Sequence, residues 1–425
     1  MKKILKKLFP ICRSITGNGF LKSLNILKKE LKELKIKHFR SGEKVFDWKI
    51  PAEWNVDDAY VFDLETKKKI IDFKENNLHL VSYSHPLDKI ISGKDLLKKI
   101  HSLPDQPAYI PYVTSYYKKT WGFCVKHSLK QRLKKQTKKK YRVFINSRFN
   151  SKGKMNYGEF YIRGKSKKEI LISTYLCHPS MANNELSGPI VGIFVMKKLK
   201  KIKLKYSLRF LIIPETIGSI SYISKNLNRL KKNVIAGYVL TCLGDSKDFS
   251  YLNSREEDTL SDKVAKKYFL TKKIKFKNYS YLHRGSDERQ YNSPGVDLPI
   301  GSIMRSKYNT YKEYHTSADN LDFVNEKNLS KSVDVVCGII EKINQNDFPI
   351  SKIKCEPFLT KYNLYPTISI KRKSSTSEDI INFLAYCDGN NDLIDISKKI
   401  NIPLDKVNKI FNLLLKNKIV KRSHV

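Results

Sequence analysis

The stretch EILISTYLCHPSMANNELSGPIVGIFVMKKL, residues 169–199, decides the fold of this chain. Its first eight residues are mostly apolar or β-branched, which is typical of a strand buried on both faces. Residues 186–199 combine small and apolar side chains over a length that favours a buried helix. A buried strand followed at once by a helix predicts an α/β sheet, and the polar residues between the two elements are expected at the carboxyl edge of that sheet.

The same alternation of strand and helix continues to about residue 346. Near-continuous apolar strands between amphipathic helices predict a mixed, mainly parallel sheet with helices on both faces. The further strands are expected over 207–215, 236–244 and 297–304, and the further helices over 219–227, 259–269 and 328–343.

Three other segments flank or interrupt this α/β pattern. Residues 1–40 have the spacing of two helices around a GNG turn, and together with 141–348 they are predicted to form one discontinuous domain. Residues 41–140 carry short β-rich pieces between turns and prolines, which predicts a small inserted β-rich domain. Residues 349–425 are predicted to contain a linker (349–373), three short helices and the start of a hairpin, which is the pattern of a winged-helix domain.

The composition narrows the class of protein. The 425 residues include 82 Lys and Arg against 41 Asp and Glu, a formal net charge of +41, which excludes an acidic protein and makes an anionic partner worth testing. Seven widely spaced cysteines without a CxxC pair argue against a disulfide framework and a structural zinc knuckle. No stretch approaches the roughly 18 apolar residues of a membrane span, and the first residues lack a signal-peptide cleavage site, so we expect a cytoplasmic protein.

Polar side chains follow four of the predicted strands. His178, Glu215 and Asp245 each come shortly after a strand, and His315 lies beyond the strand that ends near Met304. Two imidazoles and a carboxylate suit a zinc ion, and a further carboxylate can act as general base on a water whose pKa the ion lowers. Each side chain taken alone also fits an ordinary capping, turn or surface role, so spacing alone leaves both interpretations open.

Cys177, beside His178, raises the alternative of a cysteine nucleophile. Adjacent residues of a strand point to opposite faces, so we do not expect the two side chains to form a catalytic pair.

Several motifs resemble the zinc-dependent aminopeptidase fold, and most closely a bacterial branch of aminopeptidase-like proteins associated with polysaccharide biosynthesis. The similarity covers nearly the whole chain, including the winged-helix tail. The motifs shared with the wider fold are CHPSMANNELSG (177–188), PETIG (214–218), TCLGD (241–245), RGSDERQYNSPGVDLP (284–299) and YHTSADN (314–320). Those similar to the branch are LFPICRSITGNG (8–19), FDWKIPAEWNV (46–56), HSLPDQPAYIPYVTSYY (101–117) and WGFC (121–124).

The resemblance implies a role for each residue at the strand ends. His178, Asp245 and His315 correspond to metal ligands. Glu215, the first acidic residue of PETIG, corresponds to the general base that activates the water.

Two positions depart from the wider fold. Its metal-bridging Asp is here Asn184, and the second Glu of its EExG motif, a ligand of a second ion, is here Thr216. Asn offers one neutral oxygen and cannot balance two divalent cations, while Glu185 is expected to point elsewhere because it enters the helix. We therefore predict one zinc ion in preference to two, with Asn184 as an additional ligand beside the two histidines and Asp245.

Three residues are predicted to bind substrate. Asp287 and Arg284 belong to a charged segment that lies near the active site in the related enzymes, and Asp287 is a candidate for a substrate amine. Arg305 is a candidate for a substrate carboxylate or phosphate through its planar fork. A surface ion-pair loop and a solvated arginine are the alternatives.

These expectations combine into a metal-dependent amide hydrolase of aminopeptidase type, in which Glu215 activates a metal-bound water. Its substrate would be a peptide or an amide-bearing small molecule such as an acylated amino sugar, in surface polysaccharide or glycan metabolism. The alternative is a catalytically impaired scaffold whose winged helix mediates protein or nucleic-acid binding. Residues 350–425 hold 14 Lys and Arg against 7 Asp and Glu, and the helix predicted over 404–418 has no arginine for base readout. A homo-oligomer contact through the winged helix is therefore favoured over nucleic acid.

Overall fold

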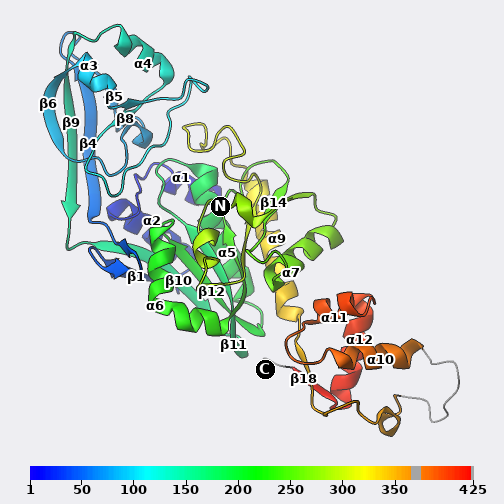
Figure 1. Ribbon diagram of the computed structural model, residues 1–425. Coiled ribbons are helices and arrows are strands. Elements are labelled where there is room, and N and C mark those ends of the chain that lie inside the picture. The colour runs from blue at the N-terminus through cyan, green and yellow to red at the C-terminus, as the bar shows by residue number, and fades with distance from the viewer. Residues whose placement is uncertain (365–374, 423–425) are drawn as a thin grey trace. The chain divides into compact units, whose positions relative to one another are not determined.

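The computed structural model of the chain describes residues 1–364 and 375–422 (Figure 1). Part of the predicted linker over 349–373 and the end of the predicted wing lie outside the described residues. The chain divides into two compact units, and the domain boundaries drawn from the sequence remain a prediction. The larger unit comprises Met1–Ile162, Glu169–Lys203 and Leu208–Ile339, and the smaller one Arg163–Lys168, Leu204–Ser207 and Ile340–Val425.

An eight-stranded mixed sheet forms the core of the α/β part, as the alternating pattern predicts. β11 pairs in parallel with β13 and β13 with β16, whereas β10 pairs antiparallel with both β1 and β12. Their apolar side chains are buried because helices cover both faces. In order across the sheet the strands are β1 (Lys35–Arg40), β10 (Lys154–Ile162), β12 (Tyr206–Ile213), β11 (Ser166–Tyr175), β13 (Val234–Leu240), β16 (Ile300–Met304), β14 (Phe249–Leu252) and β15 (Phe276–Tyr279).

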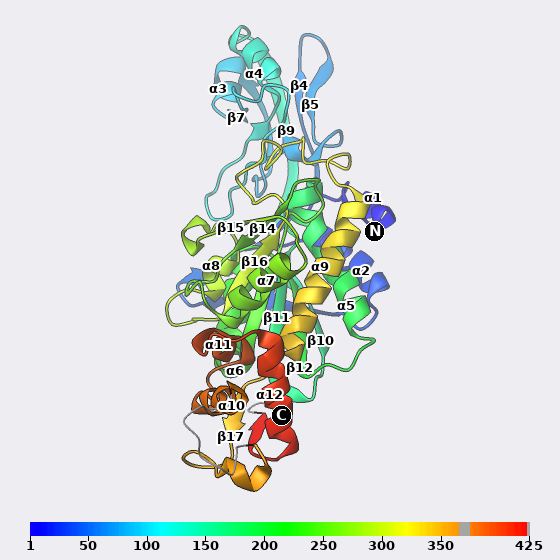
Figure 2. The ribbon, with the colours of Figure 1, turned by 90° about the vertical axis from the view of Figure 1, so that its right-hand side faces the viewer.

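Helices lie on both sides of this sheet (Figure 2). On one face, Gly192 of α5 leaves room for the ring of Phe210 on β12. On the other face, the Tyr222 hydroxyl of α6 donates a hydrogen bond of 2.6 Å to Glu159 on β10. The helices are α1 (Lys2–Leu8), α2 (Asn18–Glu30), α5 (Ser187–Leu199), α6 (Ile217–Asn233), α7 (Leu260–Thr271), α8 (Glu288–Tyr291) and α9 (Glu326–Gln345).

The second helix predicted within residues 1–40 is shorter than its sequence pattern indicated. It ends at Glu30, and Lys35–Arg40 forms the edge strand β1. The reason is local: KIKHFR buries Phe39 while its neighbours His38 and Arg40 stay exposed, and the segment pairs antiparallel with β10. The lysine-rich segment before it has apolar residues at helical spacing, so the sequence pattern did not reveal the change from helix to strand.

The inserted β-rich region contains a four-stranded antiparallel sheet in the order β5-β4-β9-β6. Its last strand, β9, leads through a turn into β10, so the insertion is joined directly to the large sheet. The strands are β4 (Glu53–Asp63), β5 (Lys68–Asp72), β6 (Leu87–Ser92) and β9 (Lys140–Asn150). Short additional elements are β2 (Lys44–Val45), β3 (Trp48–Lys49), β7 (Ile100–His101), β8 (Phe123–Cys124), α3 (Gly93–Leu97) and α4 (His127–Lys134).

The C-terminal region has the winged-helix arrangement that its sequence predicts. Its strand β18 pairs antiparallel with β17, which precedes the helices, and this pairing closes the small apolar core around Phe383 and Phe411. The elements are β17 (Pro349–Ser351), α10 (Ser375–Ala385), α11 (Leu393–Lys399), α12 (Leu404–Lys416) and β18 (Val420–Arg422). Among the described residues, no helix is long and apolar enough to cross a bilayer.

Candidate active site

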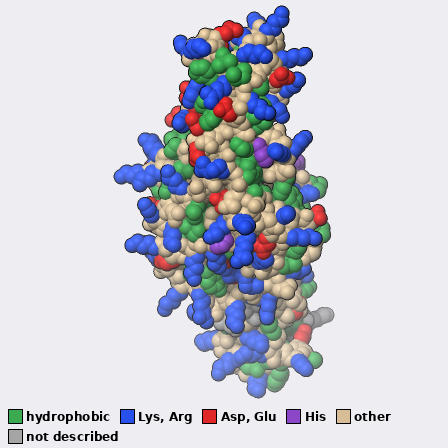
Figure 3. Space-filling model, turned by 90° about the vertical axis from the view of Figure 1, so that its left-hand side faces the viewer, with side chains coloured by type: hydrophobic (Ala, Val, Ile, Leu, Met, Phe, Trp, Pro, Cys, Tyr) green, Lys and Arg blue, Asp and Glu red, His purple; other side chains and the backbone are tan. Residues whose placement is uncertain are grey.

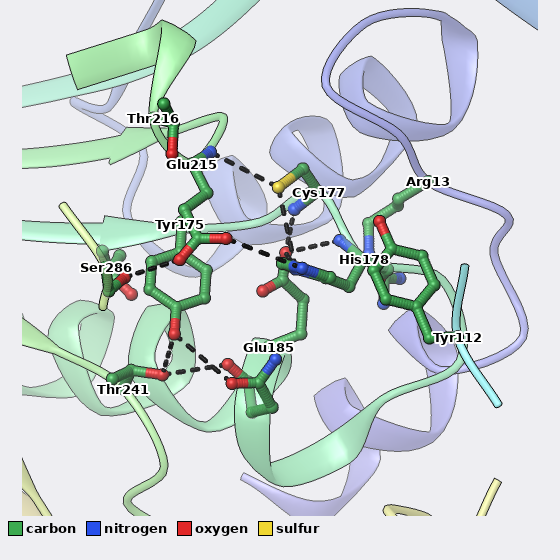
Figure 4. A network of polar contacts seen from close by, with 12 residues as sticks. Arg13, Tyr112, Tyr175, Cys177, His178, Glu185, Glu215, Thr216, Thr241 and Ser286 are labelled. Carbon is green, nitrogen blue, oxygen red and sulfur yellow. Dashed lines mark hydrogen bonds and ion pairs between the residues drawn. The ribbon is translucent and has the colours of Figure 1, made fainter. Parts of the chain in front are cut away.

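Two histidines and a glutamate meet at the carboxyl edge of the large sheet. His178 follows β11 and Glu215 follows β12, while His315 comes from a loop far along the chain. The ring centroids of His178 and His315 lie 5.0 Å apart. The Nε2 atom of His178 lies 3.6 Å from Oε2 of Glu215 (Figure 4). The His315 ring and the Glu215 carboxylate therefore both lie close to the His178 ring.

Glu185 holds the His178 ring from the opposite side. Its Oε1 atom accepts hydrogen bonds from the backbone N–H groups of Cys177 and His178 and lies 3.0 Å from Nδ1 of the same imidazole. A carboxylate on Nδ1 fixes the ring and leaves Nε2 directed toward Glu215. Burial lowers the pKa of His178, but the Glu185 and Glu215 carboxylates outweigh it, and the net shift is upward.

Glu185 lies on the Nδ1 side of His178, and the expectation that it does not join Asn184 as a metal ligand stays a prediction. Residues Ala182–Leu186 form a π-helical turn, η2, ahead of α5, rather than a regular helix entry. The wider turn changes the direction in which each side chain projects, which brings Glu185 under His178.

The His315 ring is largely enclosed beside that of His178. Burial, followed by the charge of His178, lowers the pKa of His315 to about 2. Its Nε2 atom is buried and has no hydrogen-bond partner among the residues that the structure describes. Tyr314 stacks on the ring at 3.9 Å and Tyr112 meets it edge-on at 5.2 Å, so the imidazole is held between two aromatic walls.

Glu215 is anchored at Oε1, and its Oε2 atom lies near His178. Ser286 donates a hydrogen bond of 2.6 Å to Oε1, and the Glu215 backbone N–H points to the Cys177 sulfur at 3.3 Å. Burial raises the pKa of Glu215, while His178 and Arg289 act in the opposite direction. A carboxylate of raised pKa with one oxygen facing the histidines has the features of a general base.

The other two predicted ligands are engaged in hydrogen bonds within the protein. Asp245 accepts bonds from the Asn183 side chain, from Ser306 and from the Lys247 backbone N–H, and it makes no ion pair with a histidine among the described residues. The Asn184 Oδ1 atom accepts from the Tyr175 hydroxyl at 3.4 Å. The ligand roles of Asp245 and Asn184 therefore stay predictions.

The residues predicted to bind substrate occupy three different settings. Asp287 is buried beside Glu215 and accepts from the Thr216 backbone N–H at 2.7 Å; burial and then Glu215 raise its pKa to about 8. Arg284 is exposed over the ring of Tyr281. Arg305 is 5% exposed, and within the described part of the chain its Nε and one terminal nitrogen lack hydrogen-bond partners.

The donor set fits a single divalent ion of the zinc type. Zinc binds imidazole nitrogen and carboxylate oxygen, and the ring of His315, whose buried Nε2 has no hydrogen-bond partner among the described residues, lies 5.0 Å from the ring of His178. Among the described residues, the set of three such side chains whose potential ligand atoms lie within 4.8 Å of one another is a different one, Cys177 with His178 and Glu185. There, however, the Nδ1 atom is directed at Glu185, and the buried guanidinium of Arg13 lies close enough to interact with the same carboxylate, which disfavours a cation.

Sequence comparison assigns the chain to a family. The family described as a domain of unknown function, DUF4910, matches residues 2–346, and a winged helix-turn-helix family matches residues 349–422. This chain belongs to the DUF4910 family. A family relative from Clostridium acetobutylicum, named as a polysaccharide biosynthesis protein with an aminopeptidase-like domain, is 41% identical over 98% of this chain and 95% of its own length.

Solved structures place the DUF4910 member in the same fold as zinc aminopeptidases. A crystal structure described as a peptidase from Clostridium acetobutylicum has a TM-score of 0.82 at 40% identity, covering 99% of this chain and 95% of that one. A zinc aminopeptidase from Bacillus subtilis has a TM-score of 0.59 at 12% identity, covering 80% and 93% of the two chains. The aminopeptidase-like fold expected from the motifs is thus confirmed.

The inserted region contributes a residue that sequence reasoning missed. The Tyr112 backbone N–H donates to the carbonyl of His315 at 2.8 Å, and Pro111 forms a β-bridge with Thr316. The Tyr112 ring lies 4.7 Å from that of His178. The motif that contains Tyr112 was recognised as typical of the family branch, but nothing in it indicated contact with the site.

Two buried charged residues support the loops around the site and were also missed. Arg13 donates to the carbonyl of His178 at 2.8 Å, and burial lowers its pKa to about 10 although Glu185 opposes the shift. Asp319 accepts from the consecutive backbone N–H groups of Ala182, Asn183 and Asn184, and so ties the His315 loop to η2.

Backbone strain gathers at this edge of the sheet. Thr216 has a φ of 63°, His315 of 54° and Ser180 of 47°, values in the left-handed region that β-branched and bulky residues rarely adopt. Such conformations cost about 1–3 kcal/mol each and persist where the surroundings impose them, typically at functional sites.

The structure argues against Cys177 as a nucleophile. Burial and then the Glu185 charge raise the pKa of the Cys177 thiol well above its usual range. A thiol held neutral is a poor nucleophile. The reason expected from the strand was wrong, however, because the Cys177 sulfur lies 3.7 Å from Nδ1 of His178.

Proposed function

We propose that this chain is a metal-dependent amide hydrolase of aminopeptidase type, with one zinc ion at the site described above. The observation that carries the proposal is the convergence of His178, His315 and Glu215 at the carboxyl edge of the sheet. The two imidazoles lie 5.0 Å apart, and one carboxylate oxygen lies 3.6 Å from Nε2 of His178.

His178 and His315 would hold the ion, His178 through Nε2 because its Nδ1 faces Glu185. When bound, a divalent ion at this position supplies a Lewis acid that polarises the scissile carbonyl and lowers the pKa of the attacking water. Asp245 remains a proposed third ligand, and it would have to exchange its bond with Ser306 or Asn183 to serve as one.

The chain's own residues then move the protons. Oε2 of Glu215 accepts a proton from the attacking water as the new C–O bond forms, and it returns that proton to the amide nitrogen as the C–N bond breaks. Ser286 fixes Oε1, so that the free oxygen faces the reaction space. The products are a carboxylic acid and an amine.

The test of the base is Glu215→Gln. Glutamine keeps the shape of the side chain and a carbonyl oxygen for Ser286, but it cannot accept the proton. We expect metal content to be unchanged and turnover of an amide substrate to fall at least about 100-fold, the scale of general-base catalysis. Unchanged turnover would show that Glu215 is not the base.

Polysaccharide or glycan metabolism is the proposed setting, and it rests on the printed name of the Clostridium acetobutylicum relative. The winged helix is proposed to mediate a homo-oligomer contact. A concentration series in analytical ultracentrifugation, comparing the full chain with a variant altered on the exposed face of α12, would test that contact.

A further inference from the structure

The charges that solvent can reach at the site are few. Glu185, Asp245, Asp287 and Asp319 are all 0–1% exposed, and each accepts hydrogen bonds from the protein. Glu215, the proposed base, has 22% of its side chain exposed. A free ammonium group of a substrate would therefore not reach these four buried carboxylates.

Arg289 supplies an exposed positive charge at the same place. Its guanidinium donates a hydrogen bond of 2.7 Å to the Thr216 hydroxyl, one residue from Glu215. Among the described residues Arg289 has no acidic partner, although its charge acts on the pKa of Glu215 after the larger effects of burial and His178. The guanidinium is thus fixed beside the base, with donors left over for a ligand.

Exposed cations are common on this chain, so exposure alone says little. Figure 3 shows Lys and Arg side chains spread over the visible face. What distinguishes Arg289 is the hydrogen bond that its guanidinium donates to the Thr216 hydroxyl. The Thr216 backbone is strained, with φ 63° and ψ −74°, and its N–H donates a hydrogen bond to Asp287. The Thr216 hydroxyl accepts the hydrogen bond from the guanidinium and Asp287 in turn holds the Thr216 backbone, so Arg289 is attached to a residue that is itself held in place.

We propose that Arg289 binds an anionic group of the substrate, a carboxylate or a phosphate, and that the site selects amides carrying such a group over amides with a free amine. A planar guanidinium with spare donors suits either oxyanion. This inference rests on the proposed amide hydrolase function. It differs from the sequence expectation, which placed Arg305 in this role.

The test measures ligand binding, so that it does not depend on turnover. Two matched pairs of small amides are titrated by calorimetry into the protein as purified: succinamate against succinamide, and N-acetyl-O-phosphoethanolamine against N-acetylethanolamine. We expect one anionic member to bind about tenfold more tightly than its neutral partner, the scale of a charge-assisted hydrogen bond. The pair with the larger ratio identifies carboxylate or phosphate as the preferred group.

Substitutions then show which residue is responsible for the preference for the anionic ligand. Arg289→Met should reduce the ratio of anionic to neutral affinity to about one, and Arg289→Lys should keep part of that ratio. Arg284→Met should leave the ratio unchanged, and so should the distant control Arg148→Met, which alters an exposed arginine on β9. Equal binding of anionic and neutral ligands in the unaltered chain would overturn the proposal. So would a preference that survives Arg289→Met or disappears in Arg284→Met, and so would tighter binding of glycinamide, which carries a free ammonium, than of either anion.

Failure of the hydrolase proposal would look different. The Glu215→Gln variant should retain the Arg289-dependent preference. If the unaltered chain shows that preference but hydrolyses no amide, the anion subsite stands and the catalytic proposal falls.

Discussion

Replacing the carboxylate behind His178 should weaken metal binding without disturbing the fold around it. In Glu185→Gln the side chain keeps its volume and an oxygen for the backbone N–H groups of Cys177 and His178. It loses the negative charge that lies 3.0 Å from Nδ1 of His178. Carboxylates in this position behind a metal-binding histidine typically contribute about 10–100-fold to metal affinity, which corresponds to roughly 1.4–2.7 kcal/mol.

The same substitution removes the negative charge that compensates the positive charge of the buried Arg13 guanidinium. Removing one member of a buried pair of charges costs about 3–5 kcal/mol of stability when the other is left uncompensated. Arg13 keeps its hydrogen bonds to the carbonyl groups of Leu8 and His178, so we expect a loss near the lower end of that range.

The assay is a competition titration of zinc against a fluorescent chelator, with unfolding by urea measured in parallel. A matched control is Glu169→Gln, which also removes a buried, ion-paired carboxylate but lies at the start of β11, where it contacts Arg209 and Arg229. Glu169→Gln should lose stability and keep its zinc affinity. Zinc binding by Glu185→Gln within about twofold of the unaltered chain would refute the role given to Glu185.

Two further predictions follow from the same contacts. His315 has a pKa of about 2 in the folded chain, against about 6.5 when unfolded, so below pH 6.5 the unfolded state binds a proton that the folded state does not. Without metal, the free energy of unfolding should therefore fall by up to about 2 kcal/mol between pH 6.5 and 5. Urea titrations at several pH values would measure this dependence, and His315→Asn should remove it. Cys177→Ala should keep turnover within a few-fold, because the buried thiol is neutral, and a loss comparable to that of Glu215→Gln would restore the cysteine nucleophile.

The sequence located the part of the site that regular secondary structure determines. His178 and Glu215 follow neighbouring strands of one sheet, and His315 was found through its motif, because local pattern and motif spacing are visible along the chain. The direction of the Glu185 side chain depends on the π-helical turn η2, which the hydrophobic periodicity of the sequence does not predict. Tyr112 meets His315 only through tertiary pairing across about 200 residues, which a single sequence does not encode in any local signal.

A similar limit applies to Asp245 and Arg289. The resemblance gave Asp245 a ligand role from its place after β13, but its bonds to Asn183 and Ser306 come from segments distant in sequence. In the sequence, Arg289 is one charged residue among several in a charged loop. Its proposed role depends on the hydrogen bond to the Thr216 hydroxyl, which the sequence does not show.

The most direct test of the central claim is an anomalous difference map at the zinc edge from crystals grown with zinc. The account predicts one peak, within bonding distance of Nε2 of His178 and of a nitrogen of His315, on the side that faces Glu215. Absence of a peak there at full zinc occupancy in solution, or a single peak at the Cys177 and Glu185 grouping instead, would contradict it.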